Sequence, residues 1–247
     1  MNIKTTFLNQ INIKEYKMNL AIIPARGNSK RIPQKNIKKF NGLPIIAWTL
    51  MIVVKSNIFD KIIVSTDDKN IAKIAKRYKA EVPFFRPKNL SNDHVGTRPV
   101  IIHAIKQMQS FEYRPTNVCC IYPTSANIST DYLKKGLLKL KSNKFNYVFS
   151  AHKNNSNILR SFIKKKKNLK MLFPNNYKKR VQDLDSVYND AGQFYWAKTE
   201  TWLKKENIFS GNSSLVEIPR HKTVDIDTIE DWKLAEKIHI MNRNEKK

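Results

Sequence analysis

Four cations crowd a short stretch that follows the first strongly apolar run of the sequence. Arg26, Lys30, Arg31 and Lys35 lie in "ARGNSKRIPQKN", directly after "LAIIP". Like charges held this close repel one another, so the cluster favours the binding of an anion. The guanidinium of Arg26 can make two hydrogen bonds to a phosphate, and Lys35 offers a compact charge. These residues predict a polyphosphate site, and a solvated basic loop is the plain alternative.

Two carboxylates near the end of the chain could hold a metal ion. Asp225 and Asp227 lie in "VDIDT", which we interpret as the tip of a strand, where residues two apart face the same side. Carboxylates that close raise each other's pKa unless a cation lies between them. Mg²⁺ favours one or two carboxylates together with substrate phosphates. With the cation stretch in the same chain, the pair predicts a magnesium site, and an acidic turn before a capped helix is the alternative.

A third group of residues suits the recognition of a sugar. The segment "YNDAGQFYWA" mixes Asp190, Gln193, Tyr195 and Trp196, which offer hydrogen bonds and an apolar face. An ordinary strand edge would account for the same residues. Other familiar sites are not supported, because the basic stretch has neither a Walker nor a G-x-G-x-x-G pattern and the histidines show no zinc or triad spacing.

The order of elements predicts an α/β fold with a mostly parallel sheet. Short apolar runs alternate with helical patterns, which is typical of right-handed βαβ crossovers. The predicted strands are 20–25, 61–66, 117–124 and 147–151, and the predicted helices are 44–56, 67–81, 97–109 and 129–142. Ligands of such sheets bind at the carboxyl ends of the strands, where the cation stretch lies. Thr66 and Asp67 lie at the end of the second predicted strand, but a helix N-cap accounts for both of them.

The alternation breaks after residue 151. Residues 152–192 are polar and basic with little helical period, and the strand-prone run "GQFYWA" follows them. This segment indicates an insertion, an arm that leaves the main sheet. Thr228 and Asp231 then form a capping-box pattern at the start of a helix over 229–241. The first 17 residues resemble an optional leader.

Length and composition narrow the class of protein. The 247 residues suffice for one large domain or two small ones. The net charge of +26 invites a nucleic-acid function, but lysine far outnumbers arginine and the cations are spread along the chain, which favours compositional bias. Cys119 and Cys120 are neighbours that would face opposite sides of a strand, as buried thiols in a reducing, cytoplasmic compartment. No stretch is long and apolar enough to span a membrane.

Five segments together resemble one family. "IPARGNSKRIPQKN", "FDKIIVSTDD", "AEVPFFRP", "YPTSA" and "DIDT" are similar to the CMP-sialic acid synthetase family of cytidylyltransferases, over nearly the whole chain from residue 18. "VCCIYPT", "RVQDLDSVYNDAGQFYW" and "GTRPVIIHAI" most resemble the members that act on pseudaminic acid. The resemblance implies a Rossmann-like sheet of the nucleotide-diphosphosugar transferase type and a homodimer, in which an arm at residues 145–192 packs on the partner.

The resemblance also implies roles for individual residues. Arg26 and Lys35 would be catalytic and would contact the triphosphate, and Asp225 and Asp227 would hold Mg²⁺. The nucleotide would be bound by Arg26, Asn28, Ser29, Lys35, Asn36, Asp67, Arg86 and Thr97. The sugar would be bound by Tyr122, Arg180, Gln182, Gln193 and Tyr195.

These roles describe the transfer of CMP from CTP to the anomeric hydroxyl of pseudaminic acid, a nine-carbon acidic sugar, with release of pyrophosphate. The protein would align the reactants and neutralise charge. Two alternatives stay open. The acceptor could be N-acetylneuraminic, legionaminic or 3-deoxy-octulosonic acid, or the chain could be a basic nucleic-acid-binding protein without catalysis. Against the second, the sequence contains no helix-turn-helix, zinc or RNP pattern.

Overall fold

The computed structural model describes residues 17–154 and 158–244. Nearly all of the expected leader lies outside these residues. Within them the centre of the molecule is a six-stranded sheet. In spatial order its strands are β10 (Ser213–Glu217), β6 (Tyr147–Lys153), β9 (Tyr188–Lys198), β5 (Pro115–Ile121), β1 (Met18–Pro24) and β4 (Lys61–Ser65). Of these strands only β9 runs antiparallel to its neighbours, so the prediction of a mostly parallel sheet is confirmed.

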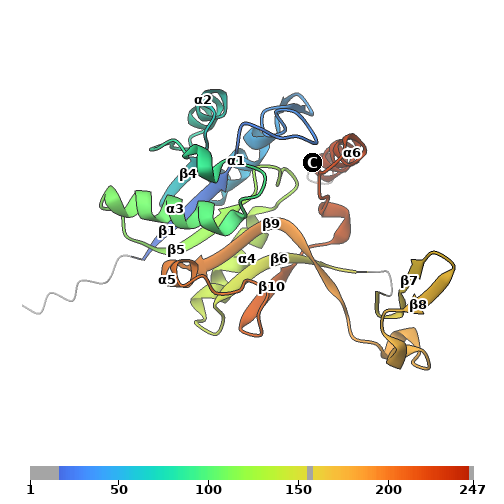
Figure 1. The fold of residues 1–247 in the computed structure, drawn as a ribbon. Coiled ribbons are helices and arrows are strands. Elements are labelled where there is room, and N and C mark those ends of the chain that lie inside the picture. The colour runs from blue at the N-terminus through green and yellow to red at the C-terminus, as the bar shows by residue number, and fades with distance from the viewer. Residues whose placement is uncertain (1–16, 155–157, 245–247) are drawn as a thin grey trace, which may run out of the picture.

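Helices cover both faces of this sheet (Figure 1). They are α1 (Ile45–Ser56), α2 (Lys69–Arg77), α3 (Thr97–Ser110), α4 (Thr130–Lys141) and α5 (Thr199–Leu203), while α6 (Ile229–Asn244) packs elsewhere. One face packs on α1, α2 and α4, and the other packs on α3 and α5. The strands therefore read as unbroken apolar runs, because alternate residues enter two different cores.

The adjacent cysteines illustrate this two-sided burial. Cys119 belongs to the core on the α4 side and Cys120 to the core on the α3 side, and both are fully buried free thiols. The prediction that they face opposite sides of a strand is confirmed. Burial raises the pKa of both thiols, because the thiolate would lose its water.

The last helix is attached through a third, smaller core. Trp232 of α6 packs edge-on against Phe40 of a short hairpin formed by β2 (Lys39–Phe40) and β3 (Leu43–Pro44). Thr228 and Asp231 form the expected reciprocal capping box, with backbone and side-chain hydrogen bonds of 2.8 to 3.1 Å. The prediction that 224–228 is a strand tip is wrong, because these residues form a loop. The buried Ile226 inserts this loop into the third core instead.

An arm leaves the sheet between β6 and β9 (Figure 1). It carries the hairpin β7 (Phe162–Lys165) and β8 (Asn168–Met171), and the short 3-10 helices η2 (Ile158–Arg160), η3 (Pro174–Asn176) and η4 (Val181–Asp183). The expected arm of residues 145–192 is longer than the part outside the sheet, since β6 and β9 pair with each other as far as Lys153 and Tyr188. After the arm, the chain returns to the sheet as β9 directly beside β6, so β9 runs antiparallel to β6.

Two further 3-10 helices, η1 (Lys88–Leu90) and η5 (Arg220–Lys222), lie in the connections before α3 and α6. No helix in the described part of the chain is long and apolar enough to cross a membrane.

Candidate active site at the carboxyl edge of the sheet

A cavity of about 610 Å³ opens at the carboxyl ends of β1 and β5. Parallel strands all end at the same edge of the sheet, so the loops that follow them meet there although they are distant in sequence. The cavity collects seven residues predicted to bind nucleotide or sugar: Arg26, Ser29, Lys35, Asn36, Arg86, Thr97 and Tyr122. Asn28 and Asp67 do not line it; they line a shallower hollow that shares Ser29 and Lys30 with the cavity.

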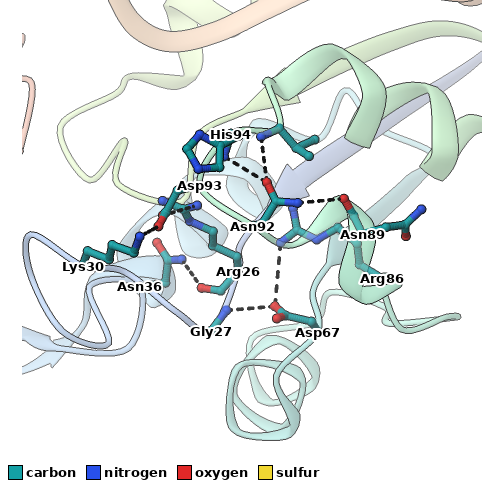
Figure 2. Close-up of polar contacts among 11 residues, drawn as sticks. Arg26, Gly27, Lys30, Asn36, Asp67, Arg86, Asn89, Asn92, Asp93 and His94 are labelled. Atoms are coloured by element: carbon teal, nitrogen blue, oxygen red, sulfur yellow. Dashed lines mark hydrogen bonds and ion pairs between the residues drawn. The ribbon is translucent and has the colours of Figure 1, made fainter.

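The loop after β1 is held in place from two sides (Figure 2). The Gly27 N–H donates to the Asp67 carboxylate at 2.9 Å, and the Asn36 amide donates to the Arg26 carbonyl at 2.9 Å. A Cβ on Gly27 would lie 2.8 Å from side-chain atoms of Asp68, so the close approach requires glycine. Asp68, not Asp67, caps α2. The interpretation of Asp67 as a helix N-cap is therefore wrong, and its carboxylate braces the loop instead.

Arg26 and Lys30 share one carboxylate (Figure 2). Asp93, from the loop before α3, lies 2.6 Å from the Arg26 guanidinium and 2.8 Å from the Lys30 ammonium. The hydrogen bond from Lys30, followed by the charge of Arg26, holds the pKa of Asp93 below its usual value. The sequence analysis did not identify Asp93 as a site residue. Its role becomes visible only in the folded chain, where the loop before α3 lies beside the cavity.

The other two cations of the stretch face the predicted metal ligands. Arg31 lies 2.6 Å from the Asp227 carboxylate, and Lys35 lies 4.0 Å from it. The Lys35 ammonium also donates to the Ile226 carbonyl at 2.7 Å. Burial lowers the pKa of Lys35, while Asp227 opposes that effect. The cation stretch is thus bracketed by Asp93 on one side and Asp227 on the other.

Asp225 and Asp227 interact electrostatically although they do not lie on a strand. Partial burial raises the pKa of Asp225, and the charge of Asp227 raises it further. Within the described residues no group of three His, Cys, Asp or Glu side chains could hold a metal ion. Two repelling carboxylates beside the predicted polyphosphate site nevertheless fit Mg²⁺, which takes its remaining ligands from phosphates and water.

Arg86 lies at the inner wall of the cavity. Its side chain is only 4% exposed, and within the described residues its Nε and Nη2 atoms have no hydrogen-bond partner. Asp67 lies 4.0 Å away, too far for a hydrogen bond. Burial lowers the pKa of Arg86, and Asp67 partly offsets this. Buried, unused donors at a cavity wall are suited to a ligand oxygen or ring nitrogen.

Thr97 and Tyr122 also line the cavity, whereas the predicted sugar ligands Gln193 and Tyr195 do not. Thr97 and Tyr122 are hydrogen-bonded at 2.9 Å, and the Tyr195 hydroxyl donates to Asp190 at 2.5 Å. Gln193 donates to the Lys222 carbonyl at 2.9 Å, which leaves its buried Oε1 without a partner among the described residues. Gln193 and Asp225 line a small second cavity of about 20 Å³.

The remaining sugar candidates do not come together in one chain. Trp196 is fully buried in the core, where its ring stacks on Phe59, so it faces away from the site. Arg180 and Gln182 lie on the exposed arm, where Arg180 pairs with Asp183 at 2.8 Å. Neither lines a cavity described here.

Comparisons with known proteins agree with this architecture. A family model described as Cytidylyltransferase matches residues 20–244. A pseudaminic acid cytidylyltransferase from Campylobacter jejuni is 40% identical over 225 residues, which are 91% of this chain and 97% of the relative. A CMP-N,N'-diacetyllegionaminic acid synthase from Legionella pneumophila is 29% identical, with 91% of this chain and 97% of the relative covered.

A solved structure extends the likeness to the fold. CMP:2-keto-3-deoxy-manno-octonic acid synthetase in complex with CTP superposes with a TM-score of 0.68, covering 93% of this chain and all of that one. The sequence identity is 13%, so this likeness concerns the fold alone. It agrees with the expected Rossmann-like sheet of the nucleotidyltransferase type.

Proposed function

The chain belongs to the cytidylyltransferase family, and from this premise we propose that it transfers CMP from CTP to the anomeric hydroxyl of pseudaminic acid. Family membership makes the protein a nucleotidyltransferase enzyme. The observation that carries the choice of sugar is the 40% identity to a pseudaminic acid cytidylyltransferase over nearly the full length of both chains. In the reaction, the sugar oxygen forms a bond to the α-phosphorus of CTP, and the bond to the departing pyrophosphate breaks.

The cavity supports the nucleotide half of this proposal. Its volume of about 610 Å³ is within the usual range for small-molecule sites. Arg26, Ser29 and Lys35 would bind the triphosphate, and the unused donors of Arg86 would bind the cytosine ring together with Asn36 and Thr97. Asn28 and Asp67 would act from behind the loop, by shaping its backbone.

The chemistry requires charge stabilisation more than covalent participation. Arg26 and Lys35 would stabilise the charge that develops on the bridging oxygen and on pyrophosphate. Asp225 and Asp227 would hold Mg²⁺, which when bound supplies Lewis-acid polarisation of the phosphate. Arg31 now pairs with Asp227 at 2.6 Å and would have to release it for that role.

We also propose a homodimer in which the arm reaches the partner. Arg180 and Gln182 would contact the sugar in the partner's site, beside Tyr122, Gln193 and Tyr195 of that subunit. The exposed apolar side chains of the arm support this assembly, because they lack cover within the described chain. The reaction would take place in the cytoplasm, where CTP is made and where free thiols persist.

Mass spectrometry of the products tests the proposal. The protein is incubated with Mg²⁺, CTP and one acceptor at a time: pseudaminic, legionaminic, N-acetylneuraminic or 3-deoxy-octulosonic acid. We expect CMP-pseudaminic acid and pyrophosphate in equal amounts, and much less product from the other acids. Replacing CTP by UTP or ATP is the matched nucleotide control. Equal or better turnover of another acid would overturn the sugar assignment.

A second acceptor has specific support. The legionaminic acid relative matches this chain over the same 91% and is itself covered over 97%. Its lower identity, 29% against 40%, places it second. The same acceptor panel decides between the two, because both acids are presented under identical conditions.

A further inference from the structure

One carboxylate lies between two cations of the stretch that is predicted to bind phosphate (Figure 2). Asp93 lines the cavity, as do Arg26 and Lys30. Its two oxygens are divided between these cations, with Oδ1 at 2.6 Å from Arg26 and Oδ2 at 2.8 Å from Lys30. A carboxylate that contacts both cations offers them negative charge and oxygen acceptors, as a phosphate would.

The loop that carries Asp93 is folded largely by its own contacts. The Asn92 side chain accepts hydrogen bonds from the N–H groups of His94 and Val95 and donates to the Asn89 carbonyl. These contacts present the Asp93 carboxylate as the point at which this loop meets the cation stretch (Figure 2). Release of the two ion pairs would therefore leave the turn itself intact.

We propose that Asp93 is an internal competitor of the nucleotide phosphates, a further residue that sets nucleotide affinity in the reaction. This inference rests on the proposed function of the cavity. In the free enzyme Asp93 is the shared counter-charge of Arg26 and Lys30. Nucleotide binding is then an exchange, in which phosphate oxygens replace the carboxylate and the loop before α3 is released from the cation stretch.

The exchange has two consequences for the reaction. The apparent affinity for nucleotide is the intrinsic affinity multiplied by the fraction of molecules in which Asp93 has released the cations. The same carboxylate re-pairs with Arg26 and Lys30 when pyrophosphate departs, so the cations never face each other without a counter-charge. The ion pairs themselves contribute little to folding, because ion pairs that are accessible to solvent are weak.

Calorimetric titration with CTP, in the absence of a sugar acceptor, tests the competition. We expect Asp93→Asn to bind CTP about three- to tenfold more tightly than wild type, both with Mg²⁺ and with EDTA. Asp93→Glu keeps the charge and is expected to bind within about twofold of wild type. Thermal unfolding of all variants should be nearly unchanged.

A remote carboxyl controls for the simple loss of one negative charge. Glu112 follows the far end of α3, whose 14 residues span on the order of 20 Å. At 0.15 M salt a charge at that distance is screened, so Glu112→Gln should bind CTP like wild type. If it tightens binding as much as Asp93→Asn does, the effect is one of net charge and the inference is wrong.

Unchanged or weaker CTP binding by Asp93→Asn also overturns the inference, since the carboxylate would then be neutral toward the nucleotide or part of its site. Failure of the proposed function is distinguishable. If wild type binds CTP but makes no CMP-sugar, the reaction assignment fails and the competition stands. If wild type does not bind CTP, the same titrations with inorganic tripolyphosphate decide the competition by the same order of affinities.

Discussion

The sheet and the arm both contain large apolar side chains, but these side chains are buried in the sheet and exposed in the arm. In the sheet, Ile22, Cys119 and Trp196 are completely buried between two layers of helices. In the hairpin of the arm, Phe162 is 55% exposed and Leu169 is 67% exposed. The sheet closes its cores within one chain, whereas the arm presents apolar surface that the described chain leaves uncovered.

The difference separates two tasks. The cavity assembles most of the predicted nucleotide ligands from one chain, because parallel strands bring their carboxyl ends to one edge. The predicted sugar ligands are divided, with Gln193 and Tyr195 in β9 of the sheet and Arg180 and Gln182 on the arm. We call the six-stranded sheet and its helices the body of the chain. The comparison predicts that catalysis depends mainly on this body and that dimerisation depends on the arm.

The largest effect is expected from removing a proposed metal ligand. Asp227→Ala should lower kcat about 10²- to 10³-fold, because a charge-stabilising contact in the transition state is lost. The fold should persist, since the Asp227 side chain contacts the exposed Arg31 and the capping hydrogen bond uses only the Asp227 backbone N–H. Pyrophosphate release, measured with CTP, Mg²⁺ and pseudaminic acid, checks the rate, and thermal unfolding checks the fold.

The remote variant Glu112→Ala should turn over like wild type, and EDTA should abolish activity in both. Full activity of Asp227→Ala would refute the proposal that Asp227 holds the metal ion. It would also remove the support for placing catalysis in the body of the chain.

The second prediction concerns the arm. Leu169→Asp should weaken dimerisation about tenfold to a hundredfold, because a leucine buried against a partner contributes roughly 1.5–3 kcal/mol. Sedimentation over a range of protein concentrations measures the dissociation constant.

The body of the chain offers a matched control. Leu138 of α4 is 68% exposed, close to the 67% of Leu169, so Leu138→Asp introduces the same charge at an equally exposed leucine. We expect Leu138→Asp to leave the dimer intact. Equal effects of the two changes, or a wild-type monomer, would remove the distinction between body and arm.

The parts of the fold that follow from local pattern were predictable from the sequence. The buried runs at β1, β4 and β5, the leucines of α4 and the capping box of α6 each follow from periodicity or hydrogen-bonding chemistry within a few residues. The loop at 224–228 was not predictable in this way, because the burial of Ile226 against the distant Phe40 decides its path. Tertiary contact overrides local β preference there.

The site residues also divide into those that the sequence indicates and those that only tertiary contact reveals. Arg26, Lys35 and Arg86 could be proposed from residue type and from a family resemblance. Asp93 could not, because its partners Arg26 and Lys30 lie more than sixty residues earlier in the sequence and nothing local indicates an ion pair. Long-range charge pairing has no sequence period, so only the assembled sheet edge reveals it.

The third prediction tests how tightly the body is packed. Gly136 of α4 faces the sheet, where an added Cβ would lie 2.7 Å from the Trp196 ring and 2.9 Å from that of Phe194. Gly136→Ala should therefore lower the free energy of unfolding by about 1–3 kcal/mol, despite the better helix propensity of alanine. Gly211→Ala, where nothing lies within 4 Å, is the control and should be nearly neutral. Urea denaturation at one protein concentration measures the free energy of unfolding of both variants. A stabilised Gly136→Ala would show that the rings of Trp196 and Phe194 can shift to make room for the methyl group.

The smallest effect separates function from stability within the body itself. Partial burial and Asp227 raise the pKa of Asp225 above 3.8, so the folded state binds this proton more tightly than the unfolded state. The resulting stabilisation is complete below the unfolded pKa and is lost as pH rises through the folded pKa. At pH 7 without metal the ionised Asp225 thus disfavours folding, and Asp225→Asn should raise Tm by about a degree or two.

The gain from Asp225→Asn should shrink as pH falls from 7 toward 4, while turnover is lost at every pH. Glu112→Gln, an exposed carboxyl outside the site, should leave Tm unchanged and controls for net charge. A lower Tm for Asp225→Asn at pH 7 would mean that the carboxylate is satisfied by partners in the folded chain. A higher Tm with lost turnover would mean that the body of the chain retains a repelling pair of carboxylates because the reaction needs both, which is a common trade of stability for activity.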